Sequence, residues 1–143
     1  MHFFHSIKKI LGLGYRLGAR YTDDNKEVDC FGMVCRYIFL RYRVNLPFLL
    51  DGKSGEQYYE EASGDKQKLV AFFIKYLNYN FVTVNKLFFV AGDVIVADES
   101  EDIPTVGIVS GGSSMVTAIP NIGTITVPLS DYEITRAFRW AGQ

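Results

Sequence analysis

The hydrophobic pattern divides the chain into a helical first half and a strand-rich second half. Apolar residues recur at helical spacing from Phe3 to Leu11, and the segment Cys30–Tyr42 is apolar almost all round. A helix that is apolar on every side is buried, so this second segment predicts a central helix. From about Leu87 onward, short runs rich in β-branched residues alternate with turn signals such as Gly111-Gly112, and these runs predict strands.

This order of elements, helices first and an antiparallel sheet afterwards, predicts an α+β fold. At 143 residues the chain fits one domain, residues 1–143, that can bury its own core. The segment 49–86 predicts a helical insertion, with a weaker and a stronger helix on either side of Ser63-Gly64. The sheet is expected to have about five strands: Val94–Ala97, Thr105–Val109, Ser114–Ile119, Thr124–Pro128 and Ile134–Trp140.

Composition and charge exclude several classes of protein. Hydrophobic residues make up 48% and charged residues 22%, as in ordinary folded domains. The net charge of −1 gives no basic field of the kind that nucleic-acid binding requires, so no nucleic-acid partner is predicted. Residues 1–43 carry eight Lys and Arg against four acids, and the remainder carries seven against twelve. An interface with a neighbouring subunit could use this asymmetry.

The sequence indicates neither a metal site nor a membrane span. No cluster of Cys and His has zinc-site spacing, so no metal and no cofactor are predicted. No apolar run reaches 18 residues, and Lys8 and Lys9 interrupt the first one, which predicts a protein without an export signal. Cys30 and Cys35 are five apart in one helix and should point to different sides of it, so a disulfide between them is not expected.

The start of the central helix carries candidate chemistry. Asp29 is a good N-cap, since its carboxylate can accept hydrogen bonds from the unpaired amides of the first turn, and Cys30 would be the first helical residue. A helix N-terminus stabilises a thiolate and lowers its pKa. The plainer interpretation is a cysteine buried for packing alone, which is common for Cys in an apolar helix.

The wider pattern resembles the NlpC-type cell-wall cysteine peptidases. Their signature "G-x-P-Y-x-x-G-G … D-C-x-G-L-V … Y … G-I-x-L-P", followed by a "P-G-D-V-V-x-F" strand, is similar to four stretches here. These stretches are Gly12–Ala19, Asp29–Val34 with Tyr37, Val44–Pro47, and Ala91–Val96. Phe31 after the cysteine, and the ending Ile134–Trp140, are closest to the branch found in phage tail tips. The resemblance spans nearly the whole chain apart from the insertion.

The resemblance implies a papain-like fold, in which the helix that carries Cys30 packs on the C-terminal sheet. It also implies that Cys30 stands at the family's nucleophile and that Tyr15 flanks the active site. The family's base is a histidine that opens an "H-V-G-I-Y-x-G" strand, and Thr105 stands at that place. The third polar residue, commonly the histidine of "M-x-H-A", corresponds to Thr117.

Threonine has no basic group near neutral pH, so neither Thr105 nor Thr117 can deprotonate the Cys30 thiol. The chain's two histidines, His2 and His5, lie in a segment that the family does not use for catalysis. The sequence therefore favours a peptidase-like domain without peptidase activity, kept as an assembly component of a phage or phage-derived tail tip. Its expected location is the virion tail, assembled in the host cytoplasm, with other tail-tip proteins as partners and peptidoglycan as a further candidate. The alternative is an active peptidoglycan endopeptidase that uses Cys30 and an unconventional base.

Two surface features complete the expectations. The acidic run Asp98–Asp102 predicts a solvated hairpin tip, without the ligand spacing of an EF-hand calcium loop. Aromatic residues are unusually dense between residues 72 and 89, and while most of these rings are expected in the core, some could form an apolar patch that docks on a partner. The rings are Phe72, Phe73, Tyr76, Tyr79, Phe81, Phe88 and Phe89.

Overall fold

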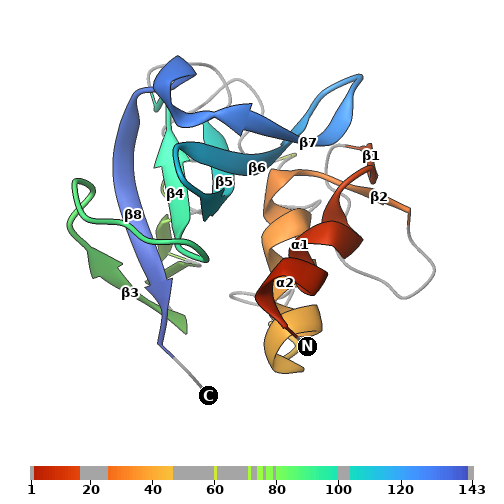
Figure 1. The fold of residues 1–143 in the computed structure, drawn as a ribbon, viewed down its shortest axis with the longest axis horizontal. Coiled ribbons are helices and arrows are strands. Elements are labelled where there is room, and N and C mark those ends of the chain that lie inside the picture. Colours follow the sequence, from red (N-terminus) through yellow and green to blue (C-terminus); the bar gives the residue numbers. More distant parts are fainter. Residues whose placement is uncertain are drawn as a thin grey trace.

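The chain is α+β, with helices on one side of a six-stranded antiparallel sheet (Figure 1). The computed structural model describes residues 2–16, 26–46, 60, 71, 74–75, 77–78, 80–99 and 104–141. The elements in chain order are α1 (Phe3–Ile10), β1 (Gly14–Tyr15), β2 (Glu27–Val28), α2 (Cys30–Tyr42), β3 (Phe81–Val84), β4 (Val94–Ala97), β5 (Thr105–Gly111), β6 (Ser114–Ile119), β7 (Gly123–Pro128), the short 3₁₀ helix η1 (Leu129–Asp131) and β8 (Ile134–Trp140). The strand order in the sheet is β3-β8-β4-β5-β6-β7.

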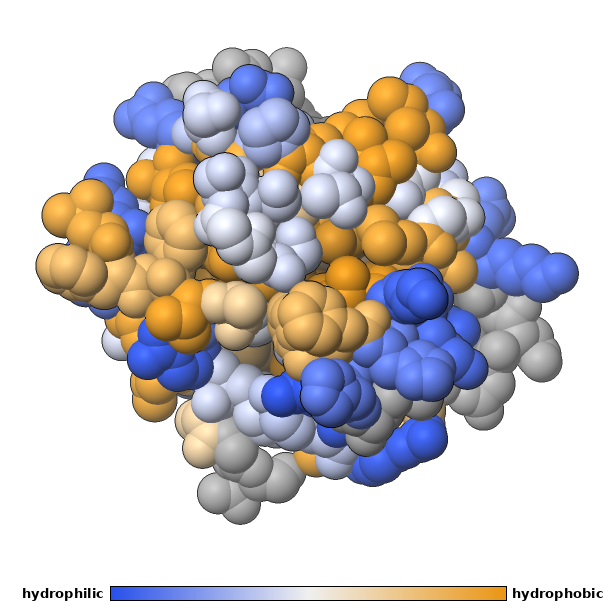
Figure 2. Space-filling view, viewed as in Figure 1, coloured by the Kyte–Doolittle hydropathy of each residue, from blue (hydrophilic) through white to orange (hydrophobic). Residues whose placement is uncertain are grey.

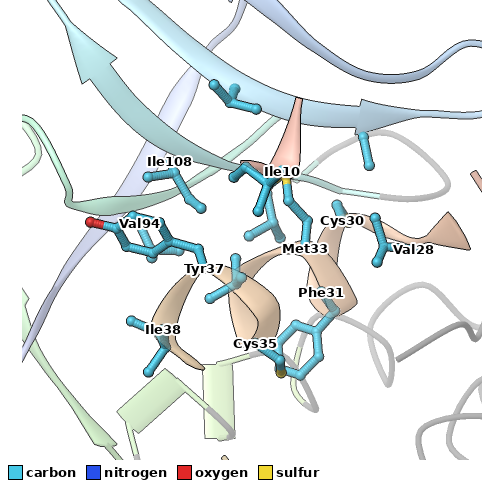
Figure 3. Packing of buried hydrophobic residues seen from close by; sticks show 14 of the residues in the cluster. Ile10, Val28, Cys30, Phe31, Met33, Cys35, Tyr37, Ile38, Val94 and Ile108 are labelled. Atoms are coloured by element: carbon cyan, nitrogen blue, oxygen red, sulfur yellow. The ribbon is translucent and has the colours of Figure 1, made fainter. Parts of the chain in front are cut away.

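The main core lies between α2 and the sheet. Met33 and Tyr37, four residues apart on α2, point toward the sheet, where Val94 and Ile108 meet them (Figure 3). The α2 helix is buried along nearly its whole length, as its apolar composition predicts. The opposite face of the sheet buries a smaller cluster formed by Ile95, Val109, Met115, Leu129 and Ala137.

The two cysteines of α2 are both buried thiols and point to different sides of the helix, as their spacing predicts (Figure 3). Cys30 lies at the start of the helix, near Val28. Cys35 lies beside Phe31, on the side that faces away from the sheet.

The predicted sheet is correct except for one strand. The expected strands Val94–Ala97, Ser114–Ile119 and Ile134–Trp140 have the observed bounds, and two others differ by one or two residues at one end. The expectation of about five strands is wrong because Phe81–Val84, placed in the helical insertion 49–86, is a sixth strand paired with β8. Asn78 and Asn80 precede this four-residue run, but so short an apolar run is ambiguous between helix and strand. Much of residues 49–80 lies outside the described residues, but residues 71, 74, 75, 77, 78 and 80 are helical.

An ion pair between a buried carboxylate and an exposed guanidinium joins the residue just before β4 to β8, at the end of the sheet that lies near the C-terminus of α2. Asp93 is almost fully buried, and both of its carboxylate oxygens accept hydrogen bonds from the Arg139 guanidinium at 2.9 Å. One of them also accepts the Val90 amide at 2.8 Å. Gly92, just before Asp93, has φ +94°, and a Cβ there would lie 3.3 Å from the Tyr37 hydroxyl. We call these four residues, Tyr37, Gly92, Asp93 and Arg139, the β4–β8 joint.

Candidate functional site

Asp29 caps the N-terminus of α2 and brings Cys30 to the start of the helix, as the sequence predicts. Its backbone is extended, and its buried carboxylate accepts the Gly32 amide at 2.7 Å. The Asp29 carbonyl accepts the first helical hydrogen bond, from Met33. Cys30 follows directly and is 4% exposed. The thiol therefore lies at the N-terminus of α2, where the helix dipole favours negative charge.

A pocket of about 200 Å³ opens at this helix start and brings together four of the five candidate residues. Cys30, Tyr15, Thr105 and Thr117 all line it, although they come from four different elements. The fifth candidate, Asp29, is the helix cap behind Cys30. The remaining lining residues are Pro104, Ala118, Ile119, Pro120 and Tyr132.

Tyr15 reaches the pocket because the described part of the glycine-rich segment, residues 12–16, is held on two sides. β1 pairs in parallel with β2, which leads directly into Asp29, and this register places Tyr15 opposite Val28. On the other side, the buried Thr124 of β7 donates its hydroxyl to the Ile10 carbonyl and accepts the Leu13 amide. Thr124 therefore holds the loop that carries Tyr15, a role that no sequence signal indicated.

The two threonines differ in their surroundings. Thr117 is buried, and its hydroxyl donates to the Val106 carbonyl at 2.8 Å. Thr105 is half-buried at the start of β5, opposite Ala97 on β4. Neither group can accept a proton from a thiol near neutral pH. Both positions nevertheless lie at the pocket that contains Cys30, where the resemblance predicts the base and the third polar residue.

Tyr132 is the pocket residue with a perturbed pKa. Burial raises the pKa of its hydroxyl above the usual value, and the carboxylates of Asp98 and Asp131 add to the rise. The Tyr132 hydroxyl is therefore protonated at neutral pH and does not act as a base there.

The acidic segment beside Tyr132 is partly anchored rather than a solvated tip. The Asp98 carboxylate accepts the Glu133 amide at 3.0 Å, while the Asp98 amide donates to the Glu133 carbonyl. Glu99 forms an ion pair with Arg136 at 3.3 Å. The expectation is therefore wrong for these first two residues of the run, and residues 100–102 lie outside the described residues.

Sequence reasoning missed Pro104, Pro120 and Tyr132 as pocket residues. Pro104 precedes β5 and Pro120 follows β6, so the antiparallel pairing of these strands brings the two prolines to the same end of the sheet. The predicted bounds of these two strands already implied that the two prolines lie close together. Tyr132 follows η1, and its position depends on the insertion of β8 between β3 and β4, which no local pattern indicates. His2 and His5 are exposed near the start of α1 and are not among the described residues that line the pocket.

In the described part of the chain, no three His, Cys, Asp or Glu side chains gather as they would around a metal ion. None of the helices found there has both the length and the apolar character that crossing a bilayer requires. Neither a scan against protein-family profiles nor a search of curated proteins finds a match to this chain.

Proposed function

We propose that the chain is an assembly component of a phage or phage-derived tail tip, built on an NlpC-type peptidase domain that has lost its catalysis. The observation that carries the loss of catalysis is the pocket itself. It contains a cysteine at a capped helix start, but the described residues that line it include no His, Asp, Glu or Lys. A thiol hydrolase needs a base within about 3 Å of the sulfur or one water away, and threonine does not supply one.

The parts of the structure that take no part in proton transfer support a domain kept for its shape. The cap on α2 and the anchored Tyr15 at the pocket, and the β4–β8 joint away from it, are all intact, whereas both positions that the resemblance assigns to proton transfer are threonine. The tail-tip assignment rests on the sequence variant, with Phe31 after the cysteine and the ending Ile134–Trp140. Other tail-tip proteins would then be the partners, in the virion.

The second candidate is an active peptidoglycan endopeptidase with Cys30 as nucleophile. The position of Cys30 at a helix N-terminus favours it, because that position lowers a thiol pKa and makes the sulfur more reactive. Tyr15 stands at the same pocket, as in the family.

The pH dependence of alkylation at Cys30 separates the two candidates. The rate of iodoacetamide modification is measured between pH 5 and about pH 10, by mass spectrometry of the peptide that contains Cys30, in the Cys35→Ala background. An unactivated thiol gives a rate that rises with a midpoint near or above about pH 8.5. A rate that levels off below about pH 7 would contradict the proposal and support the enzyme.

Restoring the base tests the assignment of the pocket. In Thr105→His, an imidazole at the family's position should shift the alkylation midpoint of Cys30 downward by about one pH unit or more. Release of soluble fragments from peptidoglycan is then measured for the unmodified chain, Thr105→His and Cys30→Ala. The unmodified chain should release no more soluble fragments than Cys30→Ala does. An unchanged alkylation midpoint in Thr105→His would mean that the pocket is not a degenerate catalytic site.

A further inference from the structure

The two edge strands of the sheet differ in how they are protected against pairing with a further strand. β7 forms one edge, and the Gly12–Gly14 segment covers its start: the Gly12 amide donates to the Thr124 carbonyl at 3.0 Å, and the Thr124 amide donates to the Leu13 carbonyl at 2.8 Å. Its last residue, Pro128, cannot donate to a further strand. Natural proteins block sheet edges with such devices to prevent unwanted pairing.

β3 forms the other edge, and none of these devices is found on it among the residues that the structure describes. Phe81–Val84 contains no proline and no charged residue, and in the described part of the chain it pairs only with β8. Figure 1 places β3 and the connector that follows it at the left margin of the molecule, and Figure 2 shows hydrophobic surface there. An apolar, unblocked edge is a template for another strand.

The register with β8 defines which backbone groups of β3 point outward. The Ala141 amide donates to the Asn80 carbonyl, so Asn80 and Ala141 are a hydrogen-bonded pair. Hydrogen-bonded and non-hydrogen-bonded pairs alternate in an antiparallel ladder. Val82 and Val84 therefore bond to β8, while the amides and carbonyls of Phe81 and Thr83 point away from it.

We infer that β3 binds β3 of a second copy of this chain, antiparallel and about a two-fold axis through Val82. In this register Phe81 lies opposite Thr83 of the partner subunit, and Thr83 lies opposite the partner's Phe81. All four outward groups of each copy are then paired, and the two Val82 side chains meet in a close non-hydrogen-bonded pair. The two sheets join into one continuous sheet, an isologous arrangement typical of dimers.

Charge and exposure also fit a second copy as the occupant. A strand without charge meets itself without repulsion, whereas a like charge opposite itself would be unfavourable. Val82 is 51% exposed, an unusual exposure for valine in a strand. Four strand residues bury less than the roughly 800 Å² per partner of a standard interface. The neighbouring connector supplies further exposed apolar surface, with Leu87 at 76%, Phe88 at 71% and Val90 at 53%.

This inference goes beyond the proposed function and does not depend on it, since a catalytically active chain could form the same dimer. The alkylation of Cys30 and the pairing of β3 are measured independently. A negative result for one therefore leaves the other intact.

A charge exchange at the proposed axis tests the dimer. The mass of the full chain is measured by sedimentation velocity over about a hundredfold range of concentration, at low salt. The unmodified chain should form dimers. Val82→Lys alone and Val82→Glu alone should each be monomeric, because each places like charges against each other at the axis, while an equimolar mixture should restore dimers. Ile122→Lys, on the β6–β7 turn at an apolar site that is 63% exposed against 51% for Val82, should leave the dimer unchanged.

Three outcomes would overturn the inference. They are a monomeric unmodified chain at every concentration, dimers that persist in both single Val82 variants, and a mixture of the two variants that stays monomeric. Circular dichroism confirms that each variant is folded. Thr83→Pro provides a second route, because it removes an outward amide while leaving the bonds of Val82 and Val84 to β8 in place, and it should abolish the dimer.

Discussion

The pocket at the start of α2 and the β4–β8 joint near the other end of this helix differ in the polar groups that they contain. At the joint, a fully buried carboxylate meets a guanidinium through two hydrogen bonds and accepts a third from the backbone. In the pocket, the described lining carries no charge, and its polar side chains are hydroxyls and a thiol. The joint therefore contributes to the free energy of folding through interactions that the pocket does not share.

If the chain is the peptidase-like domain proposed above, this difference fits a scaffold kept independently of the chemistry. In an enzyme of this type the catalytic charges would lie in the pocket and would have to be balanced there. Here the balanced charges lie at the joint, where they hold strands together. Asp93→Ala at the joint should consequently destabilise the fold without affecting Cys30, whereas Asp29→Ala beside the pocket should also change the reactivity of Cys30.

The largest effect is expected for Asp93→Ala. The change removes the acceptor of the Val90 amide and both hydrogen bonds from Arg139, and hydrogen bonds to charged groups are strong. Unfolding in urea should show a loss of about 2 to 3 kcal/mol in the free energy of unfolding. The alkylation profile of Cys30 should not change. Arg136→Ala, which removes an exposed ion pair to Glu99, is the matched control and should cost little. Equal losses in the two variants would contradict the importance of the joint.

The second largest loss of stability is expected at Asp29, the helix cap beside the pocket. Asp29→Ala leaves the Gly32 amide without its 2.7 Å acceptor in a buried position, and should destabilise the chain by about 1 to 2 kcal/mol. In contrast to Asp93→Ala, it should also accelerate alkylation of Cys30, because the first turn of α2 frays and the thiol becomes accessible. Asp131→Ala, at an exposed acid in η1, should change neither quantity. An Asp29→Ala variant as stable as the unmodified chain would show that the cap contributes nothing.

Local sequence patterns predicted the helix cap and most strand bounds. The contacts between strands that are distant in the sequence depend on the packing of the whole sheet. The cap at Asp29 follows from a short polar residue before an apolar helix, and three strands were predicted to the residue from short runs rich in β-branched and aromatic residues. The pairing of Asp93 with Arg139 was not predicted. It depends on β8 crossing to lie between β3 and β4, a choice made by the packing of the whole sheet.

Most candidate residues of the site were predicted from the resemblance. The helix-start pattern alone indicated Asp29 and Cys30, whereas Tyr15, Thr105 and Thr117 were candidates only because they match the family's motifs. All of these except Asp29, the helix cap, line one pocket. The role of Thr124 was not predicted, because it depends on β7 lying against the loop after α1. A threonine inside a strand pattern has no local feature that would indicate such a contact.

A smaller effect of opposite sign is expected within the joint at Tyr37. Its hydroxyl is buried and makes no hydrogen bond of ordinary geometry in the described structure; burial, with a lesser contribution from the neighbouring Tyr42, raises its pKa above the usual value. Tyr37→Phe should therefore increase the free energy of unfolding by about 1 kcal/mol at neutral pH, because an unsatisfied polar group is no longer buried.

The same substitution changes the response to alkaline pH. In the unfolded chain Tyr37 ionises near pH 10, whereas in the folded chain it keeps its proton to higher pH, so unfolding releases a proton in that window. The stability of the unmodified chain should therefore fall as the pH rises above about 10. The fall should be shallower in Tyr37→Phe, as measured by urea unfolding at pH 8 and at pH about 10.5. Identical slopes for the two chains would mean that Tyr37 is not the group that titrates.

The smallest effect should separate the two threonines of the pocket. Thr117→Val removes the hydroxyl that bonds to the Val106 carbonyl inside the sheet and should cost about 1 kcal/mol. Thr105→Val keeps the β-branched shape that suits a strand, at a half-buried position whose hydroxyl has no described hydrogen bond, so it should change stability by less than about 0.5 kcal/mol. Thermal unfolding of both variants measures the difference. If stability does not require a hydroxyl at residue 105, a base could occupy that position without harm to the fold, and its absence would then support the proposed loss of the reaction. An equal cost at the two positions would contradict this distinction.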